Sequence, residues 1–248
     1  ADLCVMCHGA VQDGAKSVHG MNELATECTK CHSPHSSSLP RLLKTEPNAI
    51  CLSCHDRELP SAGSKPERKI PNFVAILKKK SVHPPAADFN QGGCVGCHNG
   101  HSSPQDRLLN HSYPFDHNYN TYEPGGNGKT NTYELCFSCH NKNMLDREVG
   151  TTETNFRKDE RKWRPFLGYK TVRKNLHWIH VVRGSDINPG MGRSCVICHD
   201  PHATDQEHLV RTSWKMGISE RQLIYQTSQT GGTCTKSCHE PRNYERLN

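Results

Sequence analysis

The sequence is poor in the residues that build an ordinary protein core. Hydrophobic residues occupy 33% of the 248 positions and aromatic residues 6%. The longest apolar stretch, Phe73 to Leu77, is followed by three lysines, so no segment approaches the ~20 apolar residues of a membrane-spanning helix. A chain this polar either buries material that is not protein or has no fixed fold.

The cysteines argue against disorder, because all fourteen fall into seven regular pairs. Six pairs read Cys-x-x-Cys-His, and the seventh has one additional residue between its cysteines. No cysteine is left over for a disulfide. The motifs are Cys4/Cys7/His8, Cys28/Cys31/His32, Cys51/Cys54/His55, Cys94/Cys97/His98, Cys136/Cys139/His140, Cys195/Cys198/His199 and Cys234/Cys238/His239.

Cys-x-x-Cys-His is the attachment sequence of c-type haem. On a helical turn, residues three apart share a face, so both thiols can bond one porphyrin while the next histidine ligates its iron. Zinc is the main alternative, but its sites give no reason for histidine directly after every second cysteine. The sequence therefore predicts seven haem c groups with seven proximal histidines.

Ten further histidines remain, and an internal repeat selects distal ligands among them. The runs Cys31 to Leu43, Cys97 to Leu109 and Cys198 to Val210 align without gaps. Each repeat has a histidine upstream, a second histidine three residues after the proximal one, and a second haem motif downstream. The six predicted distal ligands are His19, His35, His83, His101, His180 and His202.

The first motif, at Cys4, stands outside the three two-haem repeats and needs a seventh distal ligand. His177 is the preferred candidate, with His117 and then His111 as alternatives. His208 falls where the other repeats have Arg41 and Arg107, so we interpret it as a basic surface or propionate-binding residue rather than as a ligand.

These residues resemble the doubled-CxxCH multihaem cytochromes of anaerobic, metal- and sulfur-respiring bacteria. The resemblance is carried by 17–20, 28–35, 42–43, 51–55, 175–181, 192–195, 200–203 and 231–244. It implies low-potential bis-histidine haems, a periplasmic or extracellular location, and electron transport to redox partners, minerals or other cells. Some relatives polymerise into filaments. The Cys-x-x-x-Cys-His motif and the haem-free stretch 141–194 depart from the simplest members.

The expected fold class is a multihaem cytochrome c, with irregular loops and short helices wrapped around a chain of seven haems that acts as the hydrophobic core, and few or no strands. Residues 1–55 would hold the first haem and the first two-haem repeat, 56–82 a basic linker, and 83–140 the second repeat. A haem-free insertion, 141–194, would precede the third repeat at 195–248. Short helices are predicted before Cys51, with Asn48 as N-cap, and around 218–226.

The formal charge of +6 does not indicate a nucleic-acid partner. Seven oxidised haems, each about −1 with both propionates ionised, bring the total to roughly −1. We expect no membrane span, and interpret Ala1 as an N-terminus left by removal of an export signal. The predicted function is electron transfer, in a possible filament or complex, rather than catalysis. The alternative is a multihaem reductase with an open first haem.

Overall fold

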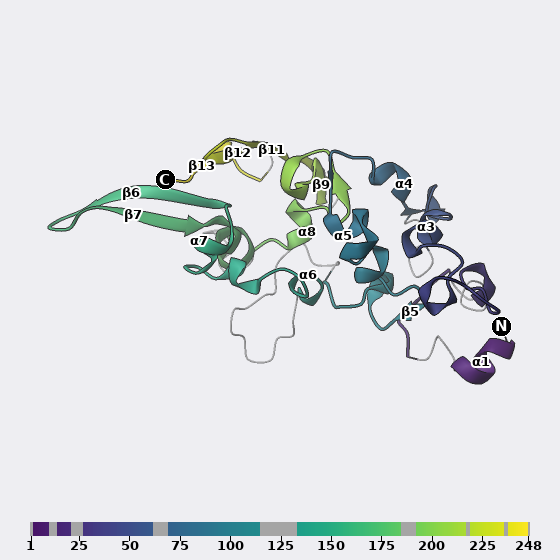
Figure 1. The fold of residues 1–248 in the computed structure, drawn as a ribbon. Coiled ribbons are helices and arrows are strands. Elements are labelled where there is room, and N and C mark those ends of the chain that lie inside the picture. Colours follow the sequence, from purple (N-terminus) through teal and green to yellow (C-terminus); the bar gives the residue numbers. More distant parts are fainter. Residues whose placement is uncertain are drawn as a thin grey trace. The chain divides into compact units, whose positions relative to one another are not determined.

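The computed structural model describes residues 2–9, 14–20, 27–61, 69–114, 133–184, 192–216, 219–235 and 238–247. Its chain divides into two compact units, Ala1–Ser112 and Tyr113–Asn248 (Figure 1). The division lies between the two haem motifs of the second repeat. No helix in the described residues is long and apolar enough to span a membrane.

The N-terminal unit consists of short helical turns and two-residue strands. Strands β1 and β5 pair in antiparallel fashion, as do β2 and β3. The helices are α1 (Asp2–His8), η1 (Cys28–Lys30), η2 (Pro40–Leu42), α3 (Pro47–Leu52), α4 (Phe73–Ile76), α5 (Pro84–Ala87), η3 (Phe89–Gln91), η4 (Cys94–Gly96) and η5 (Asp106–Leu108). The strands are β1 (Ser17–Val18), β2 (Leu59–Pro60), β3 (Lys69–Ile70), β4 (Ser81–Val82) and β5 (Ser102–Ser103).

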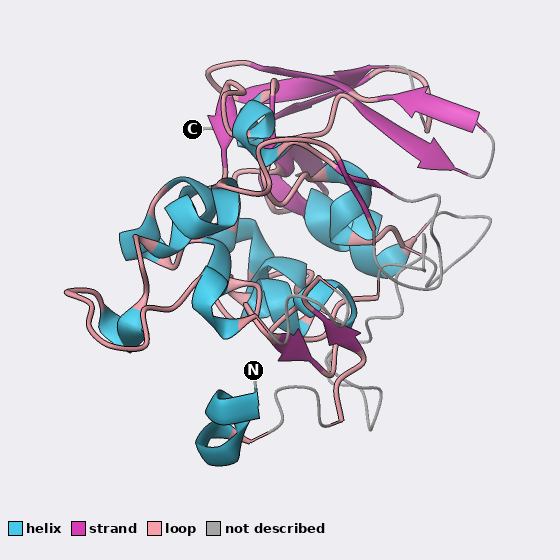
Figure 2. Cartoon of the chain, turned by 90° about the vertical axis from the view of Figure 1, so that its right-hand side faces the viewer, coloured by secondary structure: helices cyan, strands magenta, loops and turns pink. Residues whose placement is uncertain are grey.

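The C-terminal unit adds longer strands to similar short helices (Figure 2). β6 pairs with β7, β9 with β10, and β12 lies between β11 and β13, all antiparallel. The helices are α6 (Glu134–Phe137), η6 (Lys142–Leu145), α7 (Gly150–Glu153), η7 (Trp178–Arg183), α8 (Cys195–Cys198) and η8 (Glu207–Leu209). The strands are β6 (Arg157–Arg164), β7 (Gly168–Asn175), β8 (Ala203–Thr204), β9 (Ser213–Met216), β10 (Ser219–Gln222), β11 (Ile224–Thr227), β12 (Gly231–Thr235) and β13 (Arg242–Glu245).

The predicted fold class is wrong in its strand content, because thirteen strands lie within the described residues. The longest hairpin, β6–β7, was missed because its residues are mostly charged and give no alternation of apolar and polar positions. Charge pairs stabilise it instead. Glu160 accepts a hydrogen bond from Lys174 on the facing strand at 2.9 Å, which lowers the pKa of Glu160, and Trp163 faces Tyr169 near the tip.

The expected helix around 218–226 is also wrong. The described part of this segment forms strands β10 and β11 instead. Hydrogen bonds to loop side chains favour the extended backbone here. The Gln206 side chain accepts from the Tyr225 amide at 2.8 Å and donates to the Leu223 carbonyl at 2.7 Å, so both backbone groups are satisfied outside a helix.

The buried apolar residues are few and unevenly divided. Within the described residues, nine hydrophobic side chains are buried, and Leu109 alone belongs to the N-terminal unit. The other eight are Tyr113, Tyr133, Leu145, Val181, Ile197, Ala203, Leu223 and Tyr244. The C-terminal unit therefore has a small protein core, and the N-terminal unit has almost none.

Candidate haem-binding sites

The haem motifs lie on single helical turns that bring both thiols and the histidine together. In the second to sixth motifs, the histidine amide donates to the carbonyl of the first cysteine over 2.9–3.0 Å. This closure is what attachment of one porphyrin to both thiols requires. The seventh motif differs, because Cys234 belongs to strand β12, and the additional residue lies in the connection to Cys238. None of the fourteen cysteines forms a disulfide.

The protein chain leaves the second cysteine of four motifs exposed. The first cysteine of each motif is half-buried, whereas the exposed second cysteines are Cys7, Cys54, Cys139 and Cys238.

The ends of two short helices explain the exposure of Cys54 and Cys139. Each cysteine follows the C-cap serine of its helix, Ser53 after α3 and Ser138 after α6. The serine hydroxyls donate to the carbonyls of Ile50 and Leu135 at 2.7 and 2.9 Å. They lie 3.9 and 3.8 Å from the cysteine sulfurs, which makes only weak contacts, and the chain does not enclose either thiol. Thioether formation at Cys54 and Cys139 therefore requires no opening of a protein core.

A repeated backbone contact orients three proximal histidines. The Nδ1 atoms of His32, His98 and His199 lie 2.8, 2.9 and 2.9 Å from a backbone carbonyl nine residues later. A donated Nδ1–H leaves Nε2 as the nitrogen that can bind a metal. The residues that supply the carbonyls are Arg41, Arg107 and His208.

These carbonyls lie on a strained turn. Their residues have φ of 60°, 60° and 55°, and the leucine after each is also left-handed. Such conformations cost free energy outside glycine, so they persist where the surroundings impose them. The alignment of Arg41, Arg107 and His208 therefore reflects a shared backbone role. Sequence reasoning missed it, because the repeat was interpreted through side-chain charge.

Four pairs of histidine rings each join a motif histidine to a histidine outside the motifs. Because a metal–imidazole bond is about 2 Å long, two imidazoles on one metal ion have ring centres about 6 Å apart. Ordinary aromatic packing covers similar distances, so the specific observation is the composition of each pair. The pairs are His19–His55 at 6.3 Å, His32–His101 at 5.8 Å, His177–His199 at 6.3 Å and His180–His239 at 6.4 Å.

Burial favours the neutral imidazole, the form that ligates iron, in six of these eight histidines. Desolvation is the largest cause that lowers the pKa of His19, His55, His101, His180 and His199. In His177 it lowers the pKa to about 3, with smaller contributions from neighbouring His199 and His180. The His180 Nδ1 also lies 2.7 Å from the Leu176 carbonyl, which directs its Nε2 away from the backbone.

The β6–β7 hairpin positions His177 and His180. β7 ends at Asn175, whose buried side chain donates to the carbonyls of Met144 and Asp146, both at 2.7 Å. Its oxygen accepts from the Trp178 amide at 3.3 Å. Asn175 thus connects the hairpin, the loop after the fifth motif and the turn that carries both histidines. Composition gave no signal for this residue.

Phe156 separates the two rings on this turn. Its ring lies 5.1 Å from His177 in an edge contact and 5.7 Å from His180. Tyr244 of β13 also packs against Phe156 in an edge contact at 5.2 Å. The two histidines are therefore held apart by an aromatic side chain, and each faces a different motif histidine.

Cysteines of consecutive repeats meet at two junctions. Cys51 and Cys94 are hydrogen-bonded through their thiols, which lowers the pKa of Cys94 to about 7 and raises that of Cys51. The predicted N-cap at Asn48 is wrong, since Glu46 occupies that position. Instead, Asn48 accepts from the Cys94 amide at 3.0 Å. A Cβ at Gly93 would lie 2.5 Å from the same oxygen.

The C-terminal unit has an equivalent junction. Cys136 hydrogen-bonds Cys195, which lowers the pKa of Cys136 and raises that of Cys195. Here the Tyr113 hydroxyl accepts from the Val196 amide at 3.1 Å, and its ring packs on Tyr133 at 5.5 Å. In both units, the second motif of one repeat meets the first motif of the next.

The remaining predicted ligands are positioned individually. His8 ends α1, exposed His35 follows η1, and His83 precedes α5. His202 Nδ1 lies 3.8 Å from the Asp200 carboxylate, and His140 follows α6. His117 lies outside the described residues, whereas His111 is half-buried in the N-terminal unit.

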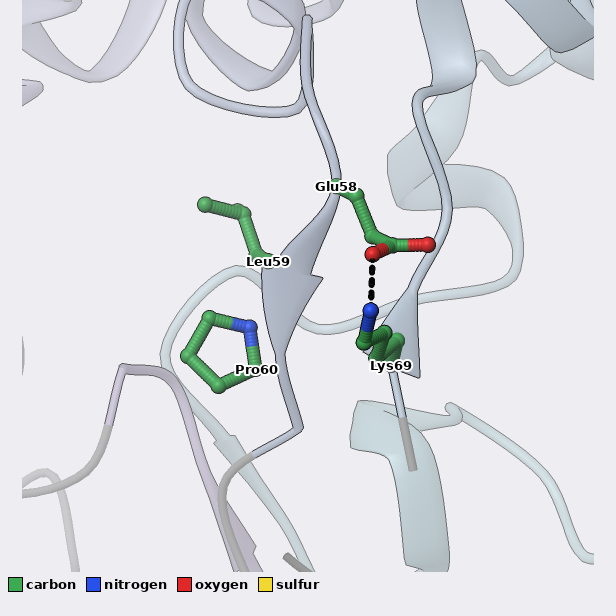
Figure 3. Close-up of a pocket in the computed structure, with 4 residues that line it drawn as sticks. All are labelled: Glu58, Leu59, Pro60 and Lys69. Carbon is green, nitrogen blue, oxygen red and sulfur yellow. Dashed lines mark hydrogen bonds and ion pairs between the residues drawn. The ribbon is translucent and has the colours of Figure 1, made fainter. Parts of the chain in front are cut away.

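No group of three or more His, Cys, Asp or Glu side chains in the described part of the chain is arranged to hold a metal ion. A small hollow of about 210 Å³ lies at the β2–β3 hairpin, lined by Glu58, Leu59, Pro60 and Lys69 (Figure 3). Its ion pair between Lys69 and Glu58 spans 2.5 Å. None of the lining residues is a cysteine or histidine, so we assign the hollow no role in haem binding.

Residues 21–59 and 83–145 match the family model described as doubled CXXCH motif. The chain carries the signature of the multihaem c-type cytochromes. The predicted family signature is thereby confirmed, and the matched motifs indicate covalently bound haem c and electron transfer. The match covers about two fifths of the chain; the first motif and the third repeat lie outside it. A comparison with curated proteins gave no match.

Proposed function

We propose that this cytochrome conducts electrons along seven bis-histidine haems, six attached to Cys-x-x-Cys-His and one to Cys-x-x-x-Cys-His. The observation that carries the proposal is the set of four histidine pairs, each combining a motif histidine with one from elsewhere at ring distances of 5.8–6.4 Å. Two axial nitrogens leave no position on iron for a substrate, so such a haem only cycles between Fe(III) and Fe(II).

The protein's own residues serve this function by fixing the ligands. The carbonyls of Arg41, Arg107 and His208 hold three proximal imidazoles in one tautomer, which limits rearrangement when the iron changes its charge. Haem bound here would supply the redox chemistry. Contact between Cys51 and Cys94, and between Cys136 and Cys195, supports close approach of successive porphyrins and hence electron hopping.

We further propose that the chain is exported and works in the periplasm or outside the cell, in respiratory electron transport. Its partners would be other redox proteins, extracellular acceptors or further copies of itself in a filament. Covalent haem attachment and the family resemblance support this location. We propose neither a nucleic-acid partner nor an enzymatic activity.

The second candidate is a multihaem reductase in which the first haem has an open iron site. One observation favours it: His8 and Cys7 are exposed, as are Leu3 and Met6 of the same helix α1, at 81% and 80%. A lightly covered haem with a single axial ligand could bind a small substrate.

The two candidates differ in spin state. The purified holoprotein should show a mass increment of seven haems and purely low-spin ferric signals by electron paramagnetic resonance, and the reduced protein should bind no carbon monoxide. One high-spin haem that binds carbon monoxide would favour the reductase. A mass without haem increments would overturn both.

A further inference from the structure

In each repeat, a second histidine follows the histidine of the first motif by three residues. We propose that this second histidine ligates the first haem of the preceding repeat, or the lone first haem in the case of the first repeat, and not a haem of its own repeat. His35 would then serve the first haem, at Cys4/Cys7, and His177 would close the haem at Cys195/Cys198. This proposal rests on the proposed bis-histidine function and specifies its ligands. It reassigns His177, which the sequence favoured for the first haem.

The first observation is the pairing of His101 in the N-terminal unit. His101 follows His98 by three residues, yet its ring lies 5.8 Å from that of His32, the proximal histidine one repeat earlier. Strand pairing imposes this placement. β1 and β5 run antiparallel with Val18 opposite Ser102, so the next residues, His19 and His101, meet across the ladder.

The second observation is that the histidine upstream of a repeat pairs with a motif histidine of its own repeat. The His19 amide donates to the His101 carbonyl at 2.8 Å, yet the His19 ring pairs with His55 at 6.3 Å. In the third repeat, His180 likewise pairs with His239 at 6.4 Å. Both upstream histidines thus face the second motif of their own repeat. The one-repeat shift is confined to the histidine that follows a first motif.

The third observation concerns the first motif of the third repeat. Its histidine, His199, faces His177, and the two ring centres lie 6.3 Å apart. The β6–β7 hairpin and Asn175 hold His177 there. His177 is therefore already paired with His199 within the C-terminal unit.

The same pairing with the preceding motif, applied to the first repeat, assigns a distal ligand to the first haem. If His101 serves the first motif of the first repeat, His35 is the equivalent donor for the motif before it, which ends at His8. Both residues belong to the N-terminal unit. The rival assignment is a reciprocal exchange, in which His35 ligates the haem of His98 while His101 ligates that of His32.

Carbon monoxide titration of the reduced holoprotein separates these assignments. His35→Gly should bind one equivalent of carbon monoxide where the wild type binds none. Imidazole added to the oxidised variant should remove its high-spin signal. In a Cys4→Ser/Cys7→Ser background, which lacks the first haem, His35→Gly should open no haem. If one equivalent still binds in that background, His35 serves another haem and the proposal is overturned.

His177→Gly provides the matching measurement. It should also bind one equivalent, and this equivalent should persist in the Cys4→Ser/Cys7→Ser background but disappear in Cys195→Ser/Cys198→Ser. The reverse pattern would restore His177 to the first haem and overturn the proposal. His111→Gly is the control, because the proposal assigns this histidine to no haem; it should bind no carbon monoxide.

If His35→Gly loses haem during assembly, His35→Met takes its place in the experiment. Methionine in place of a histidine ligand raises the haem potential, so a single haem should titrate at higher potential. That shift should vanish in the Cys4→Ser/Cys7→Ser background; its persistence would contradict the proposal. Carbon monoxide binding by the wild type would instead contradict the bis-histidine function itself, so the two failures are distinguishable.

Discussion

The two units place histidine pairs at the same spacing around very different interiors. Within the described residues, the N-terminal unit buries one hydrophobic side chain, Leu109, whereas the C-terminal unit buries eight. The N-terminal unit holds His19 and His101 through the two-residue strands β1 and β5. The C-terminal unit uses a hairpin of two eight-residue strands, a buried asparagine and an aromatic spacer. The ligand spacing thus does not depend on a shared protein core.

This difference teaches where the stability of each unit comes from. A buried apolar side chain contributes roughly 1.5–3 kcal/mol, so the C-terminal unit has a source of stability that the N-terminal unit lacks. In the N-terminal unit, covalent attachment and iron–histidine bonds would have to replace it, as metals do in other small scaffolds. The predictions below test that contrast, beginning with the largest effect.

Removal of haem should produce the largest difference in protease resistance between the two units. When the chain is produced without haem attachment, residues 1–112 should be cleaved by a nonspecific protease at least several times faster than residues 113–248, because the latter retain a protein core. Mass spectrometry of timed digests measures this. The holoprotein is the control and should resist cleavage in both units. Equal rates in the haem-free chain would refute the contrast.

Asn175→Asp should have the largest effect among single substitutions in the C-terminal unit. It removes two donated hydrogen bonds and sets a carboxylate against two carbonyls. Each lost buried bond costs about 1–3 kcal/mol, so we expect a loss of roughly 2–5 kcal/mol in unfolding free energy, measured by denaturant titration. A high-spin signal should appear as His177 and His180 lose their support.

The matched control for this substitution is Asn90→Asp, at an exposed asparagine in the N-terminal unit. It should change the unfolding free energy by less than about 0.5 kcal/mol. If both variants behave alike, Asn175 has no special role in the positioning of the distal histidines.

The attachment motifs and the family could be predicted from the sequence because haem chemistry fixes residue types at short spacing. The ligand pairing could not, since spacing within a repeat does not reveal that β1 and β5 bring His19 and His101 together. The β6–β7 hairpin was missed because Glu160 and its lysine partners resemble a solvated surface in sequence. The role of Arg41 was hidden because a carbonyl, not the charge, makes the contact.

The exposure of individual attachment thiols could not be predicted from the sequence either. Cys51 and Cys54 belong to one motif and differ little in their neighbours along the chain, yet Cys51 is half-buried against Cys94 and Cys54 is exposed. Cys136 and Cys139 differ in the same way. Burial here depends on which thiol faces the next repeat, and the spacing within a motif does not encode that direction.

The two junctions between repeats provide a smaller test of the comparison. Asn48→Ala removes the acceptor for the Cys94 amide, and Tyr113→Phe removes the acceptor for the Val196 amide. Each loss should cost about 1 kcal/mol. Because the N-terminal unit has less core to compensate, Asn48→Ala should increase protease cleavage of its own unit more than Tyr113→Phe does. Digests of the two holoprotein variants, compared with the wild type, measure this. Equal cleavage would indicate that the junctions contribute equally in both units.

The smallest effect is expected at the tip of the β6–β7 hairpin. Trp163 and Phe166 are exposed by 63% and 105%, whereas the side chain of Asp159, nearer the hairpin base, is fully buried and accepts from the Leu247 amide at 3.0 Å. Trp163→Ser with Phe166→Ser should change the unfolding free energy by less than about 0.5 kcal/mol and leave every haem low-spin. Asp159→Ala should cost about 1–3 kcal/mol, because it leaves buried donors without an acceptor. If the tip variant altered the spin state, the positioning of His177 would depend on the whole hairpin and not on its base.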